Sequence, residues 1–144
     1  MRDKLVHHPN SSIRETLAEH STDKHRHAML DNNESNGMVQ VTIAGHGNSS
    51  IHDRLLKHKN PSVRMTVAKY GKFHHSAALL DDDYVKREAQ RAVAKHVENM
   101  NHSQLKDHKD HPHEFVHRMV ERKINDNKKL DDLLDEIKDN PLMK

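Results

Sequence analysis

The second fifty residues of the chain repeat the first fifty without a gap. Residues 1–50 and 51–100 are identical at fifteen of the fifty aligned positions, where about three identities would be expected by chance. The shared positions include Leu5 and Leu55, Arg14 and Arg64, and Ala18 and Ala68. Self-similarity of this kind is typical of architectures built from repeated structural units.

A shorter period lies inside this duplication. Residues 13–20, 39–46, 63–70 and 89–96 share one template, and their starts are 26, 24 and 26 residues apart. The sixth position of each segment is alanine, which allows two helices to approach closely; these residues are Ala18, Ala44, Ala68 and Ala94. The unit is therefore about 25 residues long, and a diverged fifth copy fits Val116 and Val120.

The spacing of apolar residues within a unit predicts helices. Val63 and Val67 are four positions apart, which places them on one face of a helix. Asn60 and Pro61 predict the start of this helix, and Gly71 predicts its end. Residues 73–80 are long enough for two further helical turns, and residues 81–83, three aspartates, are expected to cap the next helix. Each unit is thus predicted to be one helix of about ten residues followed by a shorter one.

The composition requires these helices to support one another. Hydrophobic residues make up only 33% of the chain and charged residues 32%, so the core must be thin. Helices of about ten residues are marginal alone in water, and stacking of units would give a one-dimensional core. The chain has no cysteine and no apolar run of the ~18 residues that span a bilayer. We expect no membrane segment, no disulfide and, because no signal region follows Met1, a cytoplasmic location.

The template at residues 60–68, Asn-Pro-Ser-Val-Arg-Met-Thr-Val-Ala, is followed by Leu-Leu-Asp-Asp-Asp at residues 79–83. This pattern resembles the variant leucine-rich repeat and the broader HEAT-like repeats. The resemblance implies an all-α, right-handed α-solenoid of about five two-helix repeats with a concave binding face. Gln40 and Gln90 depart from it where the template has arginine, and the cysteine cluster of some variant repeats is absent. We expect the duplicated array at residues 1–106, and a diverged fifth repeat with a C-terminal capping helix at residues 107–144.

Repeat arrays usually bind partners through surface residues of one face. We therefore expect a non-catalytic scaffold without cofactor, metal or enzymatic activity, which docks as an accessory regulator or inhibitor on a larger protein complex. The candidate partner-binding residues are Arg14, Arg64, Tyr70, Tyr84, Lys86, Arg87 and Arg91. For Arg14 and Arg64 an alternative is an internal ion pair with Asp31, Asp81 or Asp83, since guanidinium and carboxylate groups pair well in bidentate geometry.

Binding to a nucleic-acid backbone is an alternative function. Basic residues are dense in the second copy, for example at Lys57, Lys86 and Lys95, and a basic face is what such binding needs. Acidic residues interrupt them, however, and few aromatic side chains are available for stacking. A loss of affinity with rising salt would distinguish this function from protein binding.

Sixteen histidines are the least usual feature of the composition. Several recur at intervals of fifty residues, namely His8, His58 and His108, His25 and His75, His46 and His96, and His52 and His102. Two packed helix layers separate such positions by roughly 16–20 Å, so these copies cannot share one metal ion and are expected to have structural roles. The clustered histidines of residues 102–117 offer ligand types suited to zinc or nickel, or form a solvated connector.

One histidine pair matches a catalytic motif. His113-Glu114-Phe115-Val116-His117 fits H-E-x-x-H, in which two histidines on one helix face hold zinc and the glutamate is the general base. A zinc metallopeptidase is therefore a remote alternative function. Against it, Pro112 places His113 at the start of a helix, Val116 is in register with the core position of Val63, and no third histidine follows at the required spacing.

The C-terminal segment predicts an amphipathic helix over residues 128–144. Its apolar residues Leu130, Leu133, Leu134 and Ile137 follow helical spacing, and Asn140-Pro141 would end the helix. This helix is expected to cap the array, to dock a partner, or to pair two copies of the chain.

Overall fold

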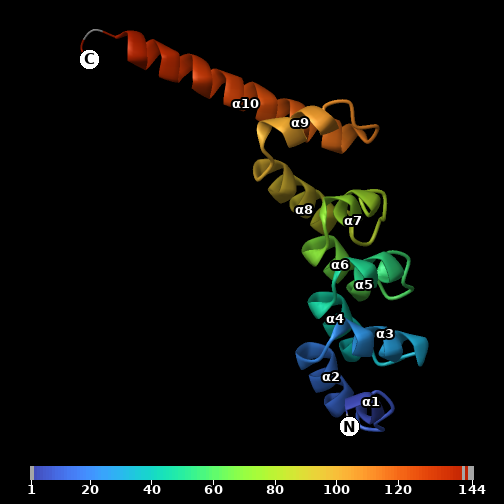
Figure 1. The fold of residues 1–144 in the computed structure, drawn as a ribbon. Coiled ribbons are helices and arrows are strands. Elements are labelled where there is room, and N and C mark those ends of the chain that lie inside the picture. Colours follow the sequence, from blue (N-terminus) through green and yellow to red (C-terminus); the bar gives the residue numbers. More distant parts are fainter. Residues whose placement is uncertain (1, 141, 143–144) are drawn as a thin grey trace. The chain divides into compact units, whose positions relative to one another are not determined.

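The computed structural model describes residues 2–140 and 142, and within them the chain forms helices and no strand (Figure 1). The prediction of an all-α fold is therefore confirmed. The chain divides into two compact units, one through Ala92 and one from Val93 onward, and the division falls within α8 (Lys86–Glu98). These are called unit 1 and unit 2 and are described separately.

Unit 1 consists of long and short helices in alternation. The helices before α8 are α1 (Arg2–Leu5), α2 (Ser11–His20), α3 (Asp23–Asp31), α4 (Gly37–His46), α5 (Ser49–Leu55), α6 (Pro61–Tyr70) and α7 (Phe73–Ala78). The ten-residue helices pack in succession, α2 on α4 and α4 on α6, while α3 packs on α5. Helices one repeat apart are thus neighbours in space (Figure 1).

The long helices start and end where their capping residues predict. The side chains of Asn10, Asn36 and Asn60 accept hydrogen bonds from the first backbone N–H groups of α2, α4 and α6, groups that would otherwise lack a partner. Pro61 occupies the first turn of α6 and Gly71 is its C-cap, as predicted.

The segment after α6 differs from the prediction. α7 ends at Ala78, and α8 begins only at Lys86. The three aspartates therefore do not cap a helix that starts directly after them. Asp82 instead accepts a hydrogen bond from the backbone N–H of Tyr84 (3.0 Å), which stabilises the turn that precedes α8.

The core of unit 1 is the stripe that the repeat template predicts. Val39, Ile43, Val63 and Val67 are at most 1% exposed, and burying one such side chain contributes roughly 1.5–3 kcal/mol. The template alanines of α2, α4 and α6 are fully buried, as expected for residues that let helices approach closely.

Each of these alanines also has a carbonyl near a helix end that needs a hydrogen-bond donor. The donor comes from the following helix, eight residues later in every copy. The three bonds, each 2.7 Å long, join Arg26 Nε to Ala18 O, His52 Nε2 to Ala44 O, and Ser76 Oγ to Ala68 O. Three different residue types thus perform one structural role, and His52 is assigned to the helix scaffold.

Unit 2 contains the end of α8, α9 (His102–His108) and α10 (Glu114–Asp139). Its buried apolar residues include Val97, Leu105, Val116 and Val120, so the core position predicted for Val116 is confirmed. No described helix is long and apolar enough to cross a membrane.

The C-terminal segment is not a separate helix. Residues 114–139 form one continuous helix, in which the predicted amphipathic segment is the second half. Asn140 is the C-cap, while Pro141 and residues 143–144 lie outside the described residues. Leu130, Leu133, Leu134 and Ile137 are each about half exposed, so the capping role predicted for this segment stays a prediction.

Candidate functional site

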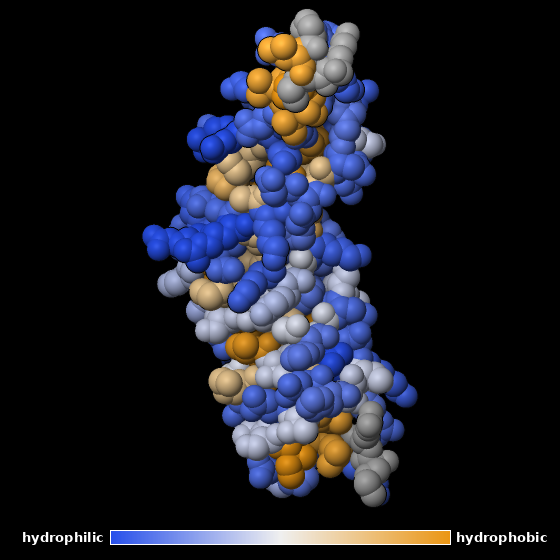
Figure 2. Space-filling view, turned by 90° about the vertical axis from the view of Figure 1, so that its left-hand side faces the viewer, coloured by the Kyte–Doolittle hydropathy of each residue, from blue (hydrophilic) through white to orange (hydrophobic). Residues whose placement is uncertain are grey.

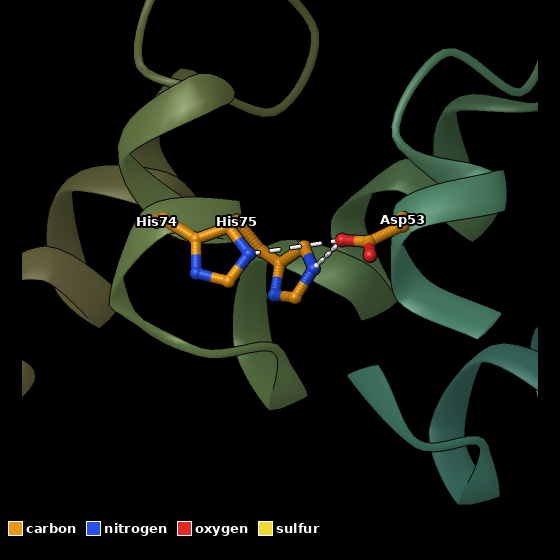
Figure 3. Close-up of side chains that lie close together, drawn as sticks. All are labelled: Asp53, His74 and His75. Atoms are coloured by element: carbon orange, nitrogen blue, oxygen red, sulfur yellow. Dashed lines mark hydrogen bonds and ion pairs between the residues drawn. The ribbon is translucent and has the colours of Figure 1, made fainter. Parts of the chain in front are cut away.

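Three side chains that can bind metal ions lie close together in unit 1. Asp53 comes from α5, and His74 and His75 come from α7 (Figure 3). The Asp53 Oδ1 atom is 2.6 Å from His75 Nε2 and 3.7 Å from His74 Nε2. His75 is fully buried, whereas the other two side chains are 61% exposed.

The tautomer of His75 decides what this cluster can do. The backbone N–H of Lys72 donates a hydrogen bond to His75 Nδ1 (3.0 Å), so Nδ1 carries the lone pair and Nε2 carries the proton of the neutral ring. Nε2 therefore donates to Asp53. A metal ion would need the lone pair at Nε2, and forming it would cost the bond from Lys72. The arrangement is built for a hydrogen bond.

The same pair recurs fifty residues earlier. His25 Nε2 lies 2.7 Å from Asp3 Oδ1, and the His25 side chain is 13% exposed. Lys24 stands where the second copy has His74, so the Asp–His pair forms without the third potential ligand. We conclude that this hydrogen bond recurs in both copies and links two successive short helices, α1 to α3 and α5 to α7.

Burial and the hydrogen bond act on this pair in different ways. The hydrogen bond from His75 lowers the pKa of Asp53 below its usual value. Burial lowers the pKa of His75, although its bond to Asp53 opposes this shift. The pair is therefore an ionised carboxylate and a neutral imidazole at neutral pH.

Other histidines shape the turns before the long helices. In three turns a histidine Nδ1 atom accepts a hydrogen bond from the backbone N–H two residues later, at 3.0–3.1 Å. In these bonds Asn10 donates to His8, Asn60 donates to His58, and His113 donates to His111. The structural role predicted for His8 and His58 is confirmed, but the third residue with this geometry is His111, not His108.

The H-E-x-x-H motif lies at the start of α10, where its first histidine caps the helix. His113 is the N-cap, and its Nδ1 accepts from the backbone N–H of Phe115 (3.1 Å). His117 Nδ1 donates to the carbonyl of Lys109 (2.7 Å), and its Nε2 faces Glu121 at 3.3 Å. Among the described residues, the set of three converging ligands is the Asp53 cluster. The motif therefore has no third ligand there, and the peptidase alternative gains no support.

Arg14 and Arg64 are engaged inside unit 1. Arg14 Nε pairs with Glu34 at 2.8 Å, and Arg64 Nε pairs with Asp82 at 2.6 Å. Each guanidinium also donates to the carbonyl of the turn histidine six residues before it, at 2.7 and 2.6 Å. Their side chains are 17% and 13% exposed. The internal ion-pair interpretation therefore describes their contacts, although the partners differ from the expected Asp31, Asp81 and Asp83.

The other candidate contact residues lie on the surface. Tyr70 and Tyr84 are 57% and 77% exposed. Lys86, Arg87 and Arg91 are exposed on the first half of α8. Tyr70 has the ammonium group of Lys69 5.3 Å from its ring centroid, while Arg91 lies 3.8 Å from Glu88. Their role in partner binding stays a prediction.

The structure adds a groove that the sequence analysis missed. It has a volume of about 430 Å³ and lies between α4, α6 and the start of α8. Its lining residues are Val41, Thr42, Gly45, His46, Met65, Thr66, Lys69, Tyr70 and Glu88. Figure 2 shows this side of unit 1 as pale and orange patches between hydrophilic areas. We call it the α4–α6 groove. Apolar residues outside the buried stripe, such as Val41 and Met65, were the available signal.

No protein-family model, curated protein or solved structure matches the chain. The resemblance to HEAT-like repeats therefore stays an expectation.

The lowered pKa of His58 predicts a measurable dependence of stability on pH. Burial, Lys59 and Arg64 lower the pKa of His58. Below about pH 6.5 the unfolded chain therefore binds more protons than the folded chain, and the free energy of unfolding decreases as the pH decreases. Protonation at Nδ1 would also remove the acceptor for Asn60 N–H. In His58→Asn the amide oxygen can accept this bond without titrating.

We expect thermal melts between about pH 7.5 and about pH 5.5 to show a smaller loss of Tm for His58→Asn than for the wild type. The loss does not vanish, because the pKa values of His75 and His111 are also lowered. The exposed His46 supplies the control His46→Asn, which should retain the wild-type slope. Identical slopes for His58→Asn and the wild type would contradict the assignment.

Proposed function

We propose that this protein is a non-catalytic scaffold that binds a segment of another protein in the α4–α6 groove. The proposal includes a right-handed α-solenoid of about five HEAT-like repeats of ~25 residues, and a role as an accessory regulator or inhibitor of a larger cytoplasmic complex. Successive packing of α2, α4 and α6 supports the repeat arrangement. So does the recurrence, at intervals of 26 and 24 residues, of the asparagine caps and of the side chains that bind the alanine carbonyls.

The observation that carries the proposal is the apolar surface in and beside the groove. Met65 and Tyr70, which line it, are 43% and 57% exposed, and Met38 of α4 is 62% exposed. Methionine adapts its shape to different partners, and tyrosine is enriched among residues that dominate binding energy. A volume of about 430 Å³ is within the range of sites that enclose small ligands, so it can take a few side chains of a partner.

The charged residues favour a protein partner over a nucleic acid. Arg14 and Arg64 pair internally, and Arg91 lies beside Glu88. The formal net charge of the chain is only +2, whereas backbone-directed nucleic-acid binding needs a continuous basic face. Lys86 and Arg87 remain suited to contact acidic side chains at the edge of a protein interface.

The test uses the substitution Met65→Asp, which places a charge in the groove. We expect the wild-type chain, immobilised and incubated with lysate of its native host, to retain a protein that Met65→Asp retains at least about tenfold less, a difference of about 1.4 kcal/mol. Leu142→Asp, at a residue that is 92% exposed in unit 2, is the matched control and should bind as the wild type does.

The captured protein is then purified and titrated against all three chains at increasing salt. A weak salt dependence would support a protein interface, whereas a steep loss of affinity, or loss of capture after nuclease treatment, would favour nucleic acid. Equal retention by Met65→Asp and the wild type would contradict the proposed site.

A further inference from the structure

The second half of α10 has an apolar face that unit 2 does not bury. Leu130, Leu133, Leu134 and Ile137 are 55, 55, 47 and 46% exposed. The buried residues of α10, Val116 and Val120, both lie in its first half. A helical segment with few tertiary contacts is marginal in water, and contiguous exposed apolar side chains usually mark an interaction surface.

The charges along α10 are separated by sign. Residues 118–129 contain five basic and two acidic side chains, a net charge of +3, whereas residues 131–139 contain one basic and five acidic side chains, a net charge of −4. The apolar face of residues 130–137 overlaps the acidic part and follows the basic part. The basic part of one helix is therefore complementary in charge to the acidic part of a second copy that runs in the opposite direction.

We propose that two copies of this chain associate through the second halves of α10 in antiparallel orientation. With Leu130 of one copy against Leu134 of the other, Lys128 and Lys129 lie level with Glu136 and Asp135 of the second copy. A parallel pair would instead place each charged residue level with its own copy, which brings like charges together along the whole interface.

The size of the face sets the strength of this association. Four half-exposed side chains per copy offer much less than the roughly 1,200 Å² that a stable interface buries. The dimer is therefore weak and concentration-dependent. The dimer surface consists of residues of unit 2 and the α4–α6 groove of residues of unit 1, so different substitutions test self-association and partner binding.

The first measurement is sedimentation equilibrium of the full chain from about 10 µM to about 500 µM, a range that covers weak association. We expect the average mass to rise from monomer toward dimer with concentration. Leu134→Glu should remain monomeric, and its circular dichroism should confirm that it is folded. A wild-type chain that stays monomeric, or a Leu134→Glu chain that dimerises as the wild type does, would overturn the proposal.

The second measurement tests orientation by charge reversal. The variant Lys128→Glu/Lys129→Glu and the variant Asp135→Lys/Glu136→Lys should each dimerise at least about threefold more weakly than the wild type. Mixing the two should restore association, because opposite charges again lie level in the antiparallel pair. Lys57→Glu/Lys59→Glu, at two exposed positions of unit 1, controls for net charge. Charge variants that dimerise as the wild type does, or a mixture that does not recover, would reject the antiparallel arrangement.

Discussion

Replacing Ile43 with alanine is expected to lower the free energy of unfolding by about 2–5 kcal/mol, the range for large-to-small changes in a packed core. Ile43 is fully buried in α4, and α4 packs against both α2 and α6. The cavity therefore weakens a helix that packs against two neighbours. Because folded domains are stable by only about 5–15 kcal/mol, the loss is a large fraction of the total.

Urea unfolding followed by circular dichroism measures this effect as a shift in the transition midpoint. Met38→Ala is the control, since Met38 is also apolar and lies on α4 but is 62% exposed. Its effect should stay within about 0.5 kcal/mol. If Ile43→Ala were no more destabilising than Met38→Ala, the packing of α4 between its two neighbours would be wrong.

Replacing Arg64 with methionine is the second substitution with a large expected effect. It leaves the Asp82 carboxylate and the His58 carbonyl without the donor that lies 2.6 Å from each. The Asp82 side chain is only 19% exposed, and leaving a shielded polar group without its partner costs about 2–3 kcal/mol. Methionine retains much of the packing of the arginine stem, so the loss reports the polar contacts.

The pH dependence of this loss provides a specific check. The hydrogen bond from Arg64 lowers the pKa of Asp82, so the ion pair stabilises the folded chain above the unfolded pKa of about 3.8 and loses this effect as pH falls through the lower, folded pKa. The difference in stability between wild type and Arg64→Met should therefore shrink below about pH 4. A constant difference across this range would contradict the assignment.

Arg91→Met is the matched control, because the Arg91 side chain is 69% exposed and lies 3.8 Å from Glu88. An exposed pair of this kind contributes at most about 1 kcal/mol.

The two variants also separate structural from binding roles. At a temperature where Arg64→Met is folded, it should still bind a partner of the α4–α6 groove, whereas a direct contact role for Arg64 would require that binding be lost.

The features that were predictable from the chain alone obey local rules. The helix over residues 61–70 starts after Asn60 and ends before Gly71, as their capping preferences indicate. Val63 and Val67 are buried because residues four positions apart share one helix face. The repeat extended these rules from one helix to the next, so a stacked core could be anticipated before any contact was known.

The roles of the polar side chains depended on contacts between helices. Arg26, His52 and Ser76 bind equivalent carbonyls, but three unlike residues give no common sequence signal. By residue type alone, His75 could equally have been a metal ligand, and the partner of its Nε2 atom, Asp53, comes from a different helix. Likewise, the spacing of Leu130 and Leu134 predicts an apolar face but does not say what covers it. Periodicity and capping act within a few residues along the chain, whereas the protonation, pairing and exposure of a side chain depend on groups that only the folded structure brings beside it.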